Sequence, residues 1–386
     1  MTIIYPVPEK LPDPRARFIQ IINTCHALAE TGIQVKLIAG MKRGYSKEDV
    51  LQFYGLPPHP NLELISLPMF RRESAGYLRF SWNGLFHLSF LLFLLVRKAY
   101  PENHMVLFLR HIKLADFILR FKKILDIPVV FEAHEIFHLG TSNKNKREVI
   151  KGLEYRVYRK ADTIVSISQS LKEYLIHMGI PQGSIYVIHD AVKREWLDIK
   201  KKHRGLYICY TGSLYPWKGV DTLISAMKHL PDEKLMIVGK GSRLKELRSL
   251  AISEGVARRV DFVGAVSHTS IPEYLAQAKV VVLPNISDGP SLFSSPLKLF
   301  EYMACDIPIV ASDIPVFREV LIDNKNALLF EPGNPSALAD TIRRITNNPE
   351  LALRLAGKAR KDAENYTYEE RARRIGEVII RGRSRY

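Results

Sequence analysis

A lysine in a glycine-containing loop is the first residue in this sequence suited to binding an anion. Lys218 lies in YTGSLYPWKG (210–219), between an apolar run and a helix expected over Val220–Lys228. Gly212 lets the backbone approach a phosphate, the helix N-terminus favours negative charge, and Lys218 adds a full positive charge. The alternative is an ordinary strand–helix turn with a solvated lysine.

A second candidate anion site lies in SSPLKLFEYMA (294–304). Ser295 as N-cap and Pro296 as first helical residue predict the start of a helix. The backbone amides at Ser294 and Ser295 are free to bind an anion there. Lys298 and Glu301 are one turn apart, so a surface ion pair is the alternative. In the functional interpretation Lys298 binds phosphate, and the two oxygens of Glu301 accept hydrogen bonds from ribose hydroxyls.

A histidine and a glycine pair follow two other apolar runs. His134 ends the run in VVFEAHE (129–135), where we expect it to face a cleft, although such histidines are also common as structural residues. His138 is a weaker candidate, and a metal site built from His134, Glu135 and His138 lacks the HExxH spacing. The segment GKGSRL (239–244) is an incomplete GxGxxG, which we interpret as a loop approaching a base or phosphates, with Gly239 in contact.

Short, β-branched runs that are apolar on both faces alternate with helical segments and must position these residues. The predicted strands are Ile3–Tyr5, Val35–Ile38, Leu62–Ile65, Val106–Leu109, Val129–Phe131, Thr163–Ile167, Ile185–Ile188, Leu206–Tyr210, Lys234–Val238, Val260–Val263, Val280–Leu283, Ile307–Val310 and Ala327–Phe330. This pattern predicts an α/β protein with two Rossmann-like, doubly wound parallel-sheet domains facing across a cleft.

The basic segment KKKHRG (200–205) is the best linker candidate between the two domains. We expect an N-terminal, acceptor-side domain over 1–199 and a C-terminal, nucleotide-sugar-binding domain over 206–365. A helix over about 368–386 is expected to pack back on the first domain.

The composition restricts the class of protein and its surroundings. The net charge is +16, the three cysteines are far apart, and the first residues lack a signal-peptide pattern, so we expect a cytoplasmic protein with an anionic partner. The apolar run Gly84–Val96 is shorter than the roughly 20 residues that span a bilayer. It is either a buried helix or an interfacial one, flanked by Arg71, Arg72, Arg79, Arg97 and Lys98 and carrying Trp82 and Phe86.

Together these segments resemble the family 4 retaining glycosyltransferases of GT-B fold. GSLYPWKGVDTLISA is similar to the phosphate loop of that family, FVGAVSHTSIPEYLAQAKVVVLP to its base-binding stretch, and SSPLKLFEYMACDIPIVASDIP to its signature helix. The likeness is weaker in RARFIQIINTCHALAETGIQVKLI and in VVFEAHE, which looks like the strand before the catalytic histidine.

The resemblance implies a hexosyltransferase-like enzyme that transfers a sugar with retained configuration and without a metal or other cofactor. Its co-substrate would be a nucleotide sugar of UDP or GDP. Lys218 would neutralise the diphosphate, Glu301 would hold the ribose, and His134 would touch the sugar. The implied donor-binding residues are Gly212, Ser213, Lys218, Gly239, Gly264, Ala265, Val266, Ser294, Ser295, Lys298 and Glu301, with Arg15 and Arg17 on the acceptor side.

The sequence departs from the family pattern at two donor-site positions. Phe293 stands where the family usually has a first glutamate, and Ser213 stands where it usually has an arginine. We predict that Lys298 replaces this arginine.

Three interpretations remain at this stage. The first is a glycosyltransferase that builds surface polysaccharide on a glycan or lipid-linked acceptor, peripherally attached to the anionic inner face of the cell membrane. The second is a sugar-nucleotide epimerase or phosphorylase of the same fold. The third is a non-catalytic basic module for nucleic acid or membrane, although no nucleic-acid module is recognisable and we expect no nucleic-acid partner.

Overall fold

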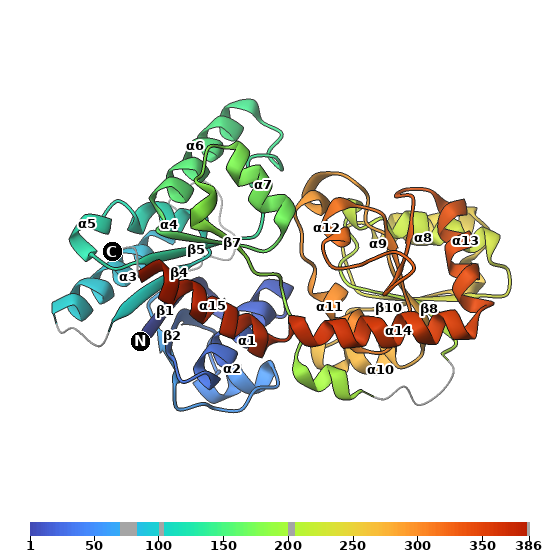
Figure 1. Ribbon diagram of the computed structural model, residues 1–386, viewed down its shortest axis with the longest axis horizontal. Helices are drawn as coiled ribbons and strands as arrows, with labels where there is room; N and C mark the ends of the chain where they lie inside the picture. Colours follow the sequence, from blue (N-terminus) through green and yellow to red (C-terminus); the bar gives the residue numbers. More distant parts are fainter. Residues whose placement is uncertain (70–82, 100–103, 200–204, 384–386) are drawn as a thin grey trace. The chain divides into compact units, whose positions relative to one another are not determined.

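The chain divides into two compact units in the computed structural model, which describes residues 1–69, 83–99, 104–199 and 205–383 (Figure 1). Unit 1 comprises Met1–Ile167, Leu171–Ile188 and Glu369–Tyr386, and unit 2 comprises Ser168–Ser170 and His189–Tyr368. Most of the predicted linker, residues 200–204, lies outside the described residues. The same is true of Arg71, Arg72, Arg79 and Trp82.

Unit 1 contains a parallel sheet of seven strands in the order β3-β2-β1-β4-β5-β6-β7. The strands are β1 (Thr2–Leu11), β2 (Gln34–Met41), β3 (Leu62–Ser66), β4 (Met105–Leu109), β5 (Val129–Ala133), β6 (Thr163–Ser166) and β7 (Ile185–Val187). The strand order reverses between β1 and β4, where a doubly wound sheet binds its ligands at the carboxyl ends of its strands.

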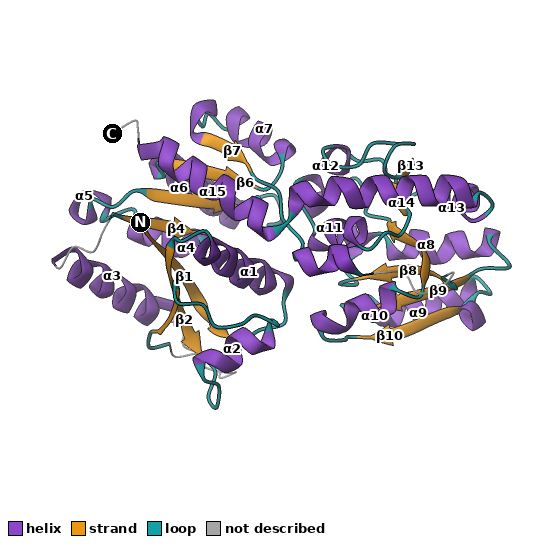
Figure 2. Ribbon diagram, turned by 60° about the horizontal axis from the view of Figure 1, so that its bottom comes forward, coloured by secondary structure: helices purple, strands orange, loops and turns teal. Residues whose placement is uncertain are grey.

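The helices of unit 1 follow its strands, as expected for βαβ units (Figure 2). They are α1 (Ala16–Glu30), α2 (Lys47–Phe53), α3 (Asn83–Ala99), α4 (Ile112–Ile118), α5 (Lys122–Leu125), α6 (Lys144–Lys160) and α7 (Gln169–His177), whose first two residues belong to unit 2, and the C-terminal α15 (Tyr368–Arg383), which belongs to unit 1 from Glu369 on.

The first strand is longer than the sequence indicates. β1 continues to Leu11, with a register shift between Val7 and Lys10, beyond the predicted end of the strand at Tyr5. Only Thr2–Ile4 pair with β4, whereas Pro6 and Val7 pair with β2 alone. Because one side of this stretch has no strand partner, a proline without an N–H costs no ladder hydrogen bond there.

Unit 2 contains a parallel sheet of six strands in the order β10-β9-β8-β11-β12-β13. The strands are β8 (Tyr207–Thr211), β9 (Lys234–Val238), β10 (Val260–Gly264), β11 (Ala278–Leu283), β12 (Ile309–Ser312) and β13 (Leu328–Phe330). The helices are α8 (Val220–Ala226), α9 (Leu244–Ser253), α10 (Ile271–Leu275), α11 (Leu297–Ala304), α12 (Pro315–Arg318), α13 (Pro335–Thr346) and α14 (Pro349–Ala363).

Alternation along the strands gives unit 2 a core on each face of its sheet. In β8, Ile208 and Tyr210 belong to one apolar cluster and Cys209 to the other, and all three are fully buried. This burial on both faces explains the uninterrupted apolar runs. The prediction of two doubly wound parallel-sheet domains is therefore confirmed for each unit.

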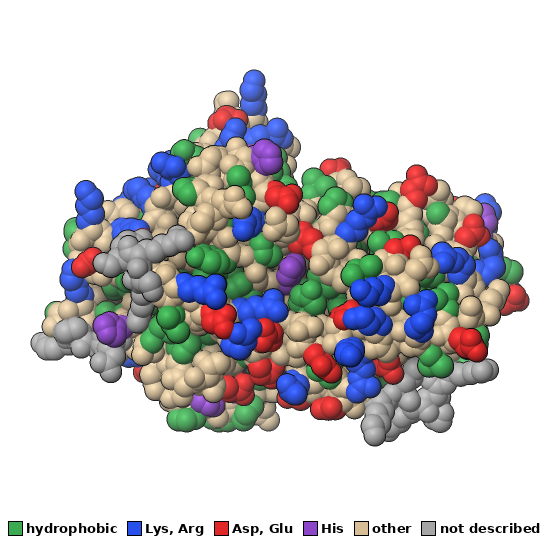
Figure 3. All heavy atoms as spheres, in the orientation of Figure 1, with side chains coloured by type: hydrophobic (Ala, Val, Ile, Leu, Met, Phe, Trp, Pro, Cys, Tyr) green, Lys and Arg blue, Asp and Glu red, His purple; other side chains and the backbone are tan. Residues whose placement is uncertain are grey.

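The charge of +16 is not concentrated on one side of the face drawn in Figure 3. Lysine and arginine side chains lie scattered among acidic ones on that face, without forming a continuous basic stripe (Figure 3).

Candidate functional site

The loop that carries Lys218 is fixed against the end of β11 by backbone contacts. Gly219 has φ +63°, and a Cβ added to it would lie 1.8 Å from the carbonyl oxygen of Pro284, so only glycine fits here. The carbonyl oxygen of Trp217 accepts hydrogen bonds from Ile286 N at 3.3 Å and from Ser291 Oγ at 2.9 Å. The position of Lys218 is therefore set by the segment between β11 and α11.

Lys298 lies in the first turn of α11, and its side chain points to the loop after β8. The ammonium nitrogen lies 3.7 Å from the centroid of the Tyr210 ring, in cation–π contact. A Cβ added to Gly212 would lie 3.4 Å from this nitrogen, which brings together two segments that the sequence analysis singled out separately. Within the described part of the chain, the buried Nζ has no hydrogen-bond partner.

The affinity of both lysines for protons is lowered by their surroundings. Burial lowers the pKa of Lys218 to about 8. Burial, and then the charge of Lys218, lower the pKa of Lys298 well below its usual value, and Glu301 opposes this shift only partly. Among the described residues, no carboxylate lies within ion-pair distance of either lysine. A buried cation pair of this kind is stabilised by a polyanion such as a diphosphate.

Binding of a diphosphate to this pair is predicted to take up protons. The negative charge of the ligand raises both pKa values, so above pH 8 each bound ligand draws protons from the buffer. Affinity should then fall as pH rises through about 8, by up to about tenfold per pH unit. Calorimetry of UDP or GDP binding at pH 7 and 9, in buffers of different ionisation enthalpy, measures both effects. Equal affinities at the two pH values, with no buffer-dependent heat, would contradict this prediction.

Glu301 pairs with a histidine and makes no ion pair with Lys298, so the surface-pair alternative is wrong. Glu301 Oε1 lies 2.7 Å from His268 Nε2, and both Glu301 and Lys298 are buried. His268 stacks on Trp196 with ring centroids 5.4 Å apart. Glu301 Oε2 has no hydrogen-bond partner within the described residues, which leaves it available to a ligand hydroxyl. His268, which orients Glu301, was not among the residues predicted from the sequence.

The helix α11 begins one residue later than the sequence indicates. Pro296, with φ −74° and ψ 132°, is the N-cap, and no side chain caps the first turn. Ser295 Oγ accepts a hydrogen bond from Asp190 N at 3.3 Å and does not cap the helix as predicted. The buried Ser294 Oγ has no hydrogen-bond partner within the described residues. The first-turn amides of α11 thus lack a side-chain cap, next to the ammonium of Lys298.

The glycines after β9 are required by packing between loops, whereas the sequence pattern had suggested only ligand binding. A Cβ added to Gly239 would lie 1.8 Å from the carbonyl oxygen of Gly212, and one added to Gly241 would lie 2.3 Å from that of Leu214. Gly239 N also donates to the carbonyl oxygen of Gly264 at 2.7 Å. These contacts join the loops after β8, β9 and β10 at one edge of the sheet. Ser213, Ala265 and Val266 follow in the same loops.

In unit 1, His134 follows β5 directly and lies beside a buried carboxylate. His134 Nε2 is 3.2 Å from Glu132 Oε2, and Glu132 also accepts hydrogen bonds from Tyr5 Oη at 3.0 Å and Gln20 Nε2 at 3.2 Å. Arg371 of α15 forms an ion pair with Glu132, and both residues are almost completely buried. The charges of His134 and Arg371 hold the pKa of Glu132 well below its usual value, although burial opposes them.

His138 belongs to a different, buried network and is not part of this arrangement. His138 Nδ1 lies 2.5 Å from Glu154 Oε2, and its Nε2 lies 3.1 Å from Tyr174 Oη. The two ring nitrogens therefore have hydrogen-bond partners on α6 and α7, which gives His138 a structural role.

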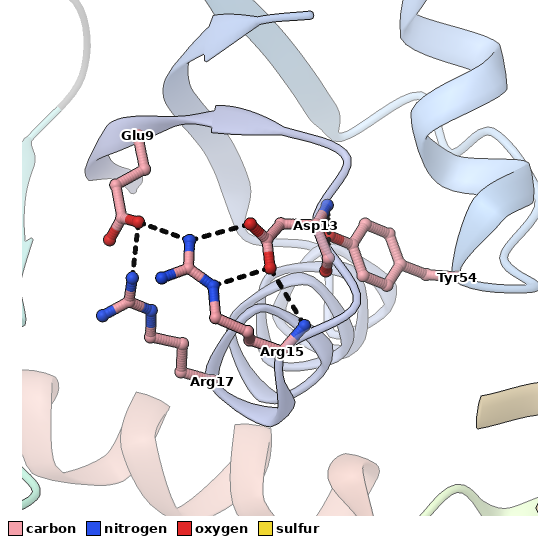
Figure 4. A network of polar contacts seen from close by, with 5 residues as sticks. All are labelled: Glu9, Asp13, Arg15, Arg17 and Tyr54. Carbon is pink, nitrogen blue, oxygen red and sulfur yellow. Dashed lines mark hydrogen bonds and ion pairs between the residues drawn. The ribbon is translucent and has the colours of Figure 1, made fainter. Parts of the chain in front are cut away.

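The predicted acceptor-side arginines are held in an ion-pair network that joins the end of β1, the following loop and the start of α1 (Figure 4). Arg15 contacts both Asp13, with Nε to Oδ1 at 2.8 Å, and Glu9, at 2.7 Å. Arg17 pairs with the same Glu9 oxygen. Of the two arginines, Arg17 lines a cavity of about 290 Å³ that also contains His134.

Two parallel α/β units, one carrying the two neighbouring lysines and the other a strand-end histidine, define a transferase of GT-B type. Residues 193–362 match the model of "Glycosyl transferases group 1", and residues 19–196 match that of "Glycosyltransferase Family 4". The chain belongs to the family 4 glycosyltransferases of GT-B fold, and it is a glycosyltransferase.

Relatives and solved structures agree with this assignment. An uncharacterised glycosyltransferase of Methanocaldococcus jannaschii is 26% identical over 252 residues, covering 64% of this chain and 67% of that one. Sucrose-phosphate synthase from Thermosynechococcus elongatus has a TM-score of 0.77 at 19% identity, with both chains fully covered. HepE of Anabaena in complex with UDP has a TM-score of 0.72 at 19% identity, covering 98% and 99% of the two chains.

Proposed function

We propose that this glycosyltransferase transfers a hexosyl group from a UDP- or GDP-sugar to a hydroxyl group, with retention of anomeric configuration. The acceptor is a glycan or lipid-linked saccharide in surface polysaccharide synthesis. The observation that carries the proposal is the pair Lys218 and Lys298, two adjacent cations without carboxylate partners among the described residues. The solved complex of HepE with UDP supports a uridine nucleotide.

The proposed reaction needs no metal. The bond between the anomeric carbon and the diphosphate oxygen breaks, and the acceptor oxygen forms its bond on the same face of the sugar. The acceptor proton passes to the leaving phosphate. Lys218, Lys298 and the first amides of α11 stabilise the negative charge that develops on the diphosphate, which is the role a divalent cation has in other transferases.

His134 is proposed to touch the transferred sugar, and Glu301 to hold the ribose. Glu301 has one oxygen fixed by His268, so its other oxygen has a defined direction. Donor contacts by backbone groups of Gly239, Gly264, Ala265 and Val266 remain part of this proposal.

The test is product analysis by NMR after incubation with UDP- and GDP-sugars in the presence of EDTA. Without acceptor, we expect slow release of free sugar and nucleoside diphosphate, the sugar appearing first in the anomeric form of the donor. An isomerised sugar nucleotide would instead indicate an epimerase. Loss of all turnover with EDTA, restored by a divalent ion, would refute the metal-independent mechanism.

The apolar helix α3 supports a proposal of peripheral attachment to the anionic inner face of the cell membrane. Phe86, Phe90 and Leu94 are fully buried, so one face of the helix packs in unit 1. The opposite face exposes an apolar stripe, in which 37–62% of each residue is accessible: Leu85, Leu88, Leu92, Leu95 and Val96. Among the described residues, no helix is long and apolar enough to cross a membrane.

Basic residues adjoin the apolar stripe, and together they indicate an anionic lipid surface as the binding partner. Arg97 and Lys98 end α3, and Lys98 Nζ donates to the carbonyl oxygen of Ile124, an exposed residue preceded by Lys123. Apolar side chains beside several cations match an anionic lipid surface, where acyl chains and headgroup phosphates lie together.

Replacing Leu88 and Leu92 with glutamine is expected to weaken vesicle binding by at least about tenfold, because two leucines no longer enter the headgroup region. Flotation with phosphatidylglycerol vesicles measures this. The matched control replaces Ile252 and Leu353, which are even more exposed and lie in unit 2, with glutamine. Absence of wild-type binding at low salt, or equal losses in both double variants, would refute attachment through α3.

A further inference from the structure

The cavity in unit 1 has an apolar wall that a sugar alone does not explain. It lies at the carboxyl ends of β1 and β5 and has a volume of about 290 Å³, near the lower limit of about 300 Å³ for small-ligand pockets. Helices α1 and α6, strand β5 and the loop after it contribute most of this wall: Phe18, Ile21, Phe131, Phe137, Ile150 and Leu153. Sugar hydroxyls against this wall would lose hydrogen bonds, so an apolar group is the better occupant.

Two cations line the same cavity without forming an ion pair in the described part of the chain, although the charge of Arg110 also acts on Glu132. Arg110 bonds only to uncharged groups, namely Gln20 Oε1 and the carbonyl oxygen of Arg17, and the exposed Lys113 follows three residues later. The other charged groups largely neutralise each other, since Arg17 pairs with Glu9 and Arg371 with Glu132. Glu135 is left as the one carboxylate of the described lining without an ion pair. Because Glu132 is neutralised by Arg371 from outside the lining, Arg110 and Lys113 together exceed Glu135 by one positive charge.

His111, in the cavity wall, lies in the same positively charged environment. Burial, and then the charges of His87, Lys113 and Arg17, lower the pKa of His111 to about 4. His111 is therefore neutral at physiological pH. An anion that enters the cavity is therefore attracted by Arg110 and Lys113 and not by His111.

The cavity borders the helix proposed to lie on the membrane. The rings of His87, on α3, and His111, at the cavity, have centroids 6.5 Å apart. His87 lies on α3 between Phe86, which is buried in the unit, and Leu88 of the apolar stripe. A lipid acceptor held in the membrane surface would thus be near the cavity that receives it.

We infer that this cavity binds an acceptor in which a phosphate adjoins an apolar chain, as in a lipid phosphate, with the chain against the aromatic wall and the phosphate near Arg110 and Lys113. The inference rests on the proposed function and narrows its acceptor to an anionic amphiphile. His134 shares the cavity, so the hydroxyl to be glycosylated belongs to the part of the acceptor nearest that residue.

Calorimetry with hexyl phosphate, in the presence of saturating UDP so that the lysine pair in unit 2 is occupied, tests this inference. Hexyl phosphate should bind at least about tenfold more tightly than glycerol phosphate or hexanol, because only it satisfies both the wall and the cations. Phe137→Gln and Lys113→Gln should each weaken binding about fivefold or more. The controls are Leu139→Gln, an exposed residue in the same loop outside the cavity, and the exposed Arg43→Gln.

The outcomes separate this inference from the proposed function. UDP binding that persists while hexyl phosphate and glycerol phosphate bind equally would overturn the inference and leave the donor site intact. Equal effects of Phe137→Gln and Leu139→Gln would also overturn it. Failure of UDP itself to bind would count against the proposed function, whereas hexyl phosphate binding that depends on Phe137 and Lys113 would still support an amphiphile site.

Discussion

Replacing Lys218 with methionine, or Lys298 with methionine, is expected to raise the Kd for UDP or GDP by roughly 10- to 100-fold, because each variant removes a charge-assisted contact to a phosphate. The rate of sugar transfer should fall by about 100- to 1000-fold, since the same charges stabilise the leaving diphosphate. Methionine keeps the length and packing of the side chain in a site where both lysines are largely enclosed. Calorimetry and initial rates measure the two effects.

The control for both variants is Lys245→Met, an exposed lysine on α9 with no hydrogen bond or ion pair among the described residues. It should bind nucleotide as the wild type does. If Lys218→Met abolishes binding while Lys298→Met leaves it unchanged, Lys298 does not replace the family arginine that is absent at Ser213. If neither variant changes the Kd, the cation pair is not the diphosphate site.

Replacing Arg371 with methionine is expected to lower the free energy of unfolding by about 3–5 kcal/mol, because it leaves the buried Glu132 carboxylate without its main cationic partner. Arg371 also donates to the carbonyl oxygen of Ile188 at 2.9 Å and to Thr24 Oγ1 at 3.3 Å, so it joins α15 to three parts of unit 1. Denaturant unfolding monitored by circular dichroism measures the change.

The stability lost in Arg371→Met is also expected to depend on pH in a defined direction. The folded-state pKa of Glu132 is depressed, so the stability it contributes is present at neutral pH and is lost as pH falls below the usual carboxyl value. Without Arg371 this pKa should rise, because burial opposes the charged form. The stability difference between wild type and variant should therefore shrink as pH falls from 7 to 4.

Two further variants test the cause of the stability loss. Arg371→Met combined with Glu132→Gln should recover much of the stability, because no buried charge is left without a partner. Arg373→Met removes an exposed arginine two residues further along α15 that pairs with Glu370 and Glu377, and it should have a far smaller effect. A loss in Arg373→Met equal to that in Arg371→Met, with no change on lowering pH, would contradict the role assigned to Glu132.

The sheets were predictable because buried parallel strands leave a strong local pattern. All thirteen predicted strands are present, since runs such as Val129–Phe131 and Val280–Leu283 are apolar on both faces. The sequence was misleading where a neighbour decides the outcome. β1 extends past Pro6 because its pairing with β2 continues there, and α11 starts after Pro296, with Ser295 bonded to Asp190 and not to a first-turn amide.

The candidate site was only partly predictable, because its pairings join residues far apart in the chain. The loop of Lys218 and the helix of Lys298 each showed a local anion-binding pattern, but their meeting at Gly212 requires the fold. Glu132 gave one signal, a carboxylate inside an apolar strand, which indicates a buried partner. Nothing in the sequence distinguishes Arg371 from the other arginines as that partner.

The central claim is that unit 2 holds a nucleoside diphosphate through Lys218, Lys298 and Glu301. Thermal unfolding in the presence of UDP, GDP and ADP tests it most directly, since a ligand that binds only the folded state raises Tm. We predict a saturable rise with at least one of the three nucleotides, strongly reduced in Lys218→Met and retained in Lys245→Met. No rise with any of the three would contradict the claim.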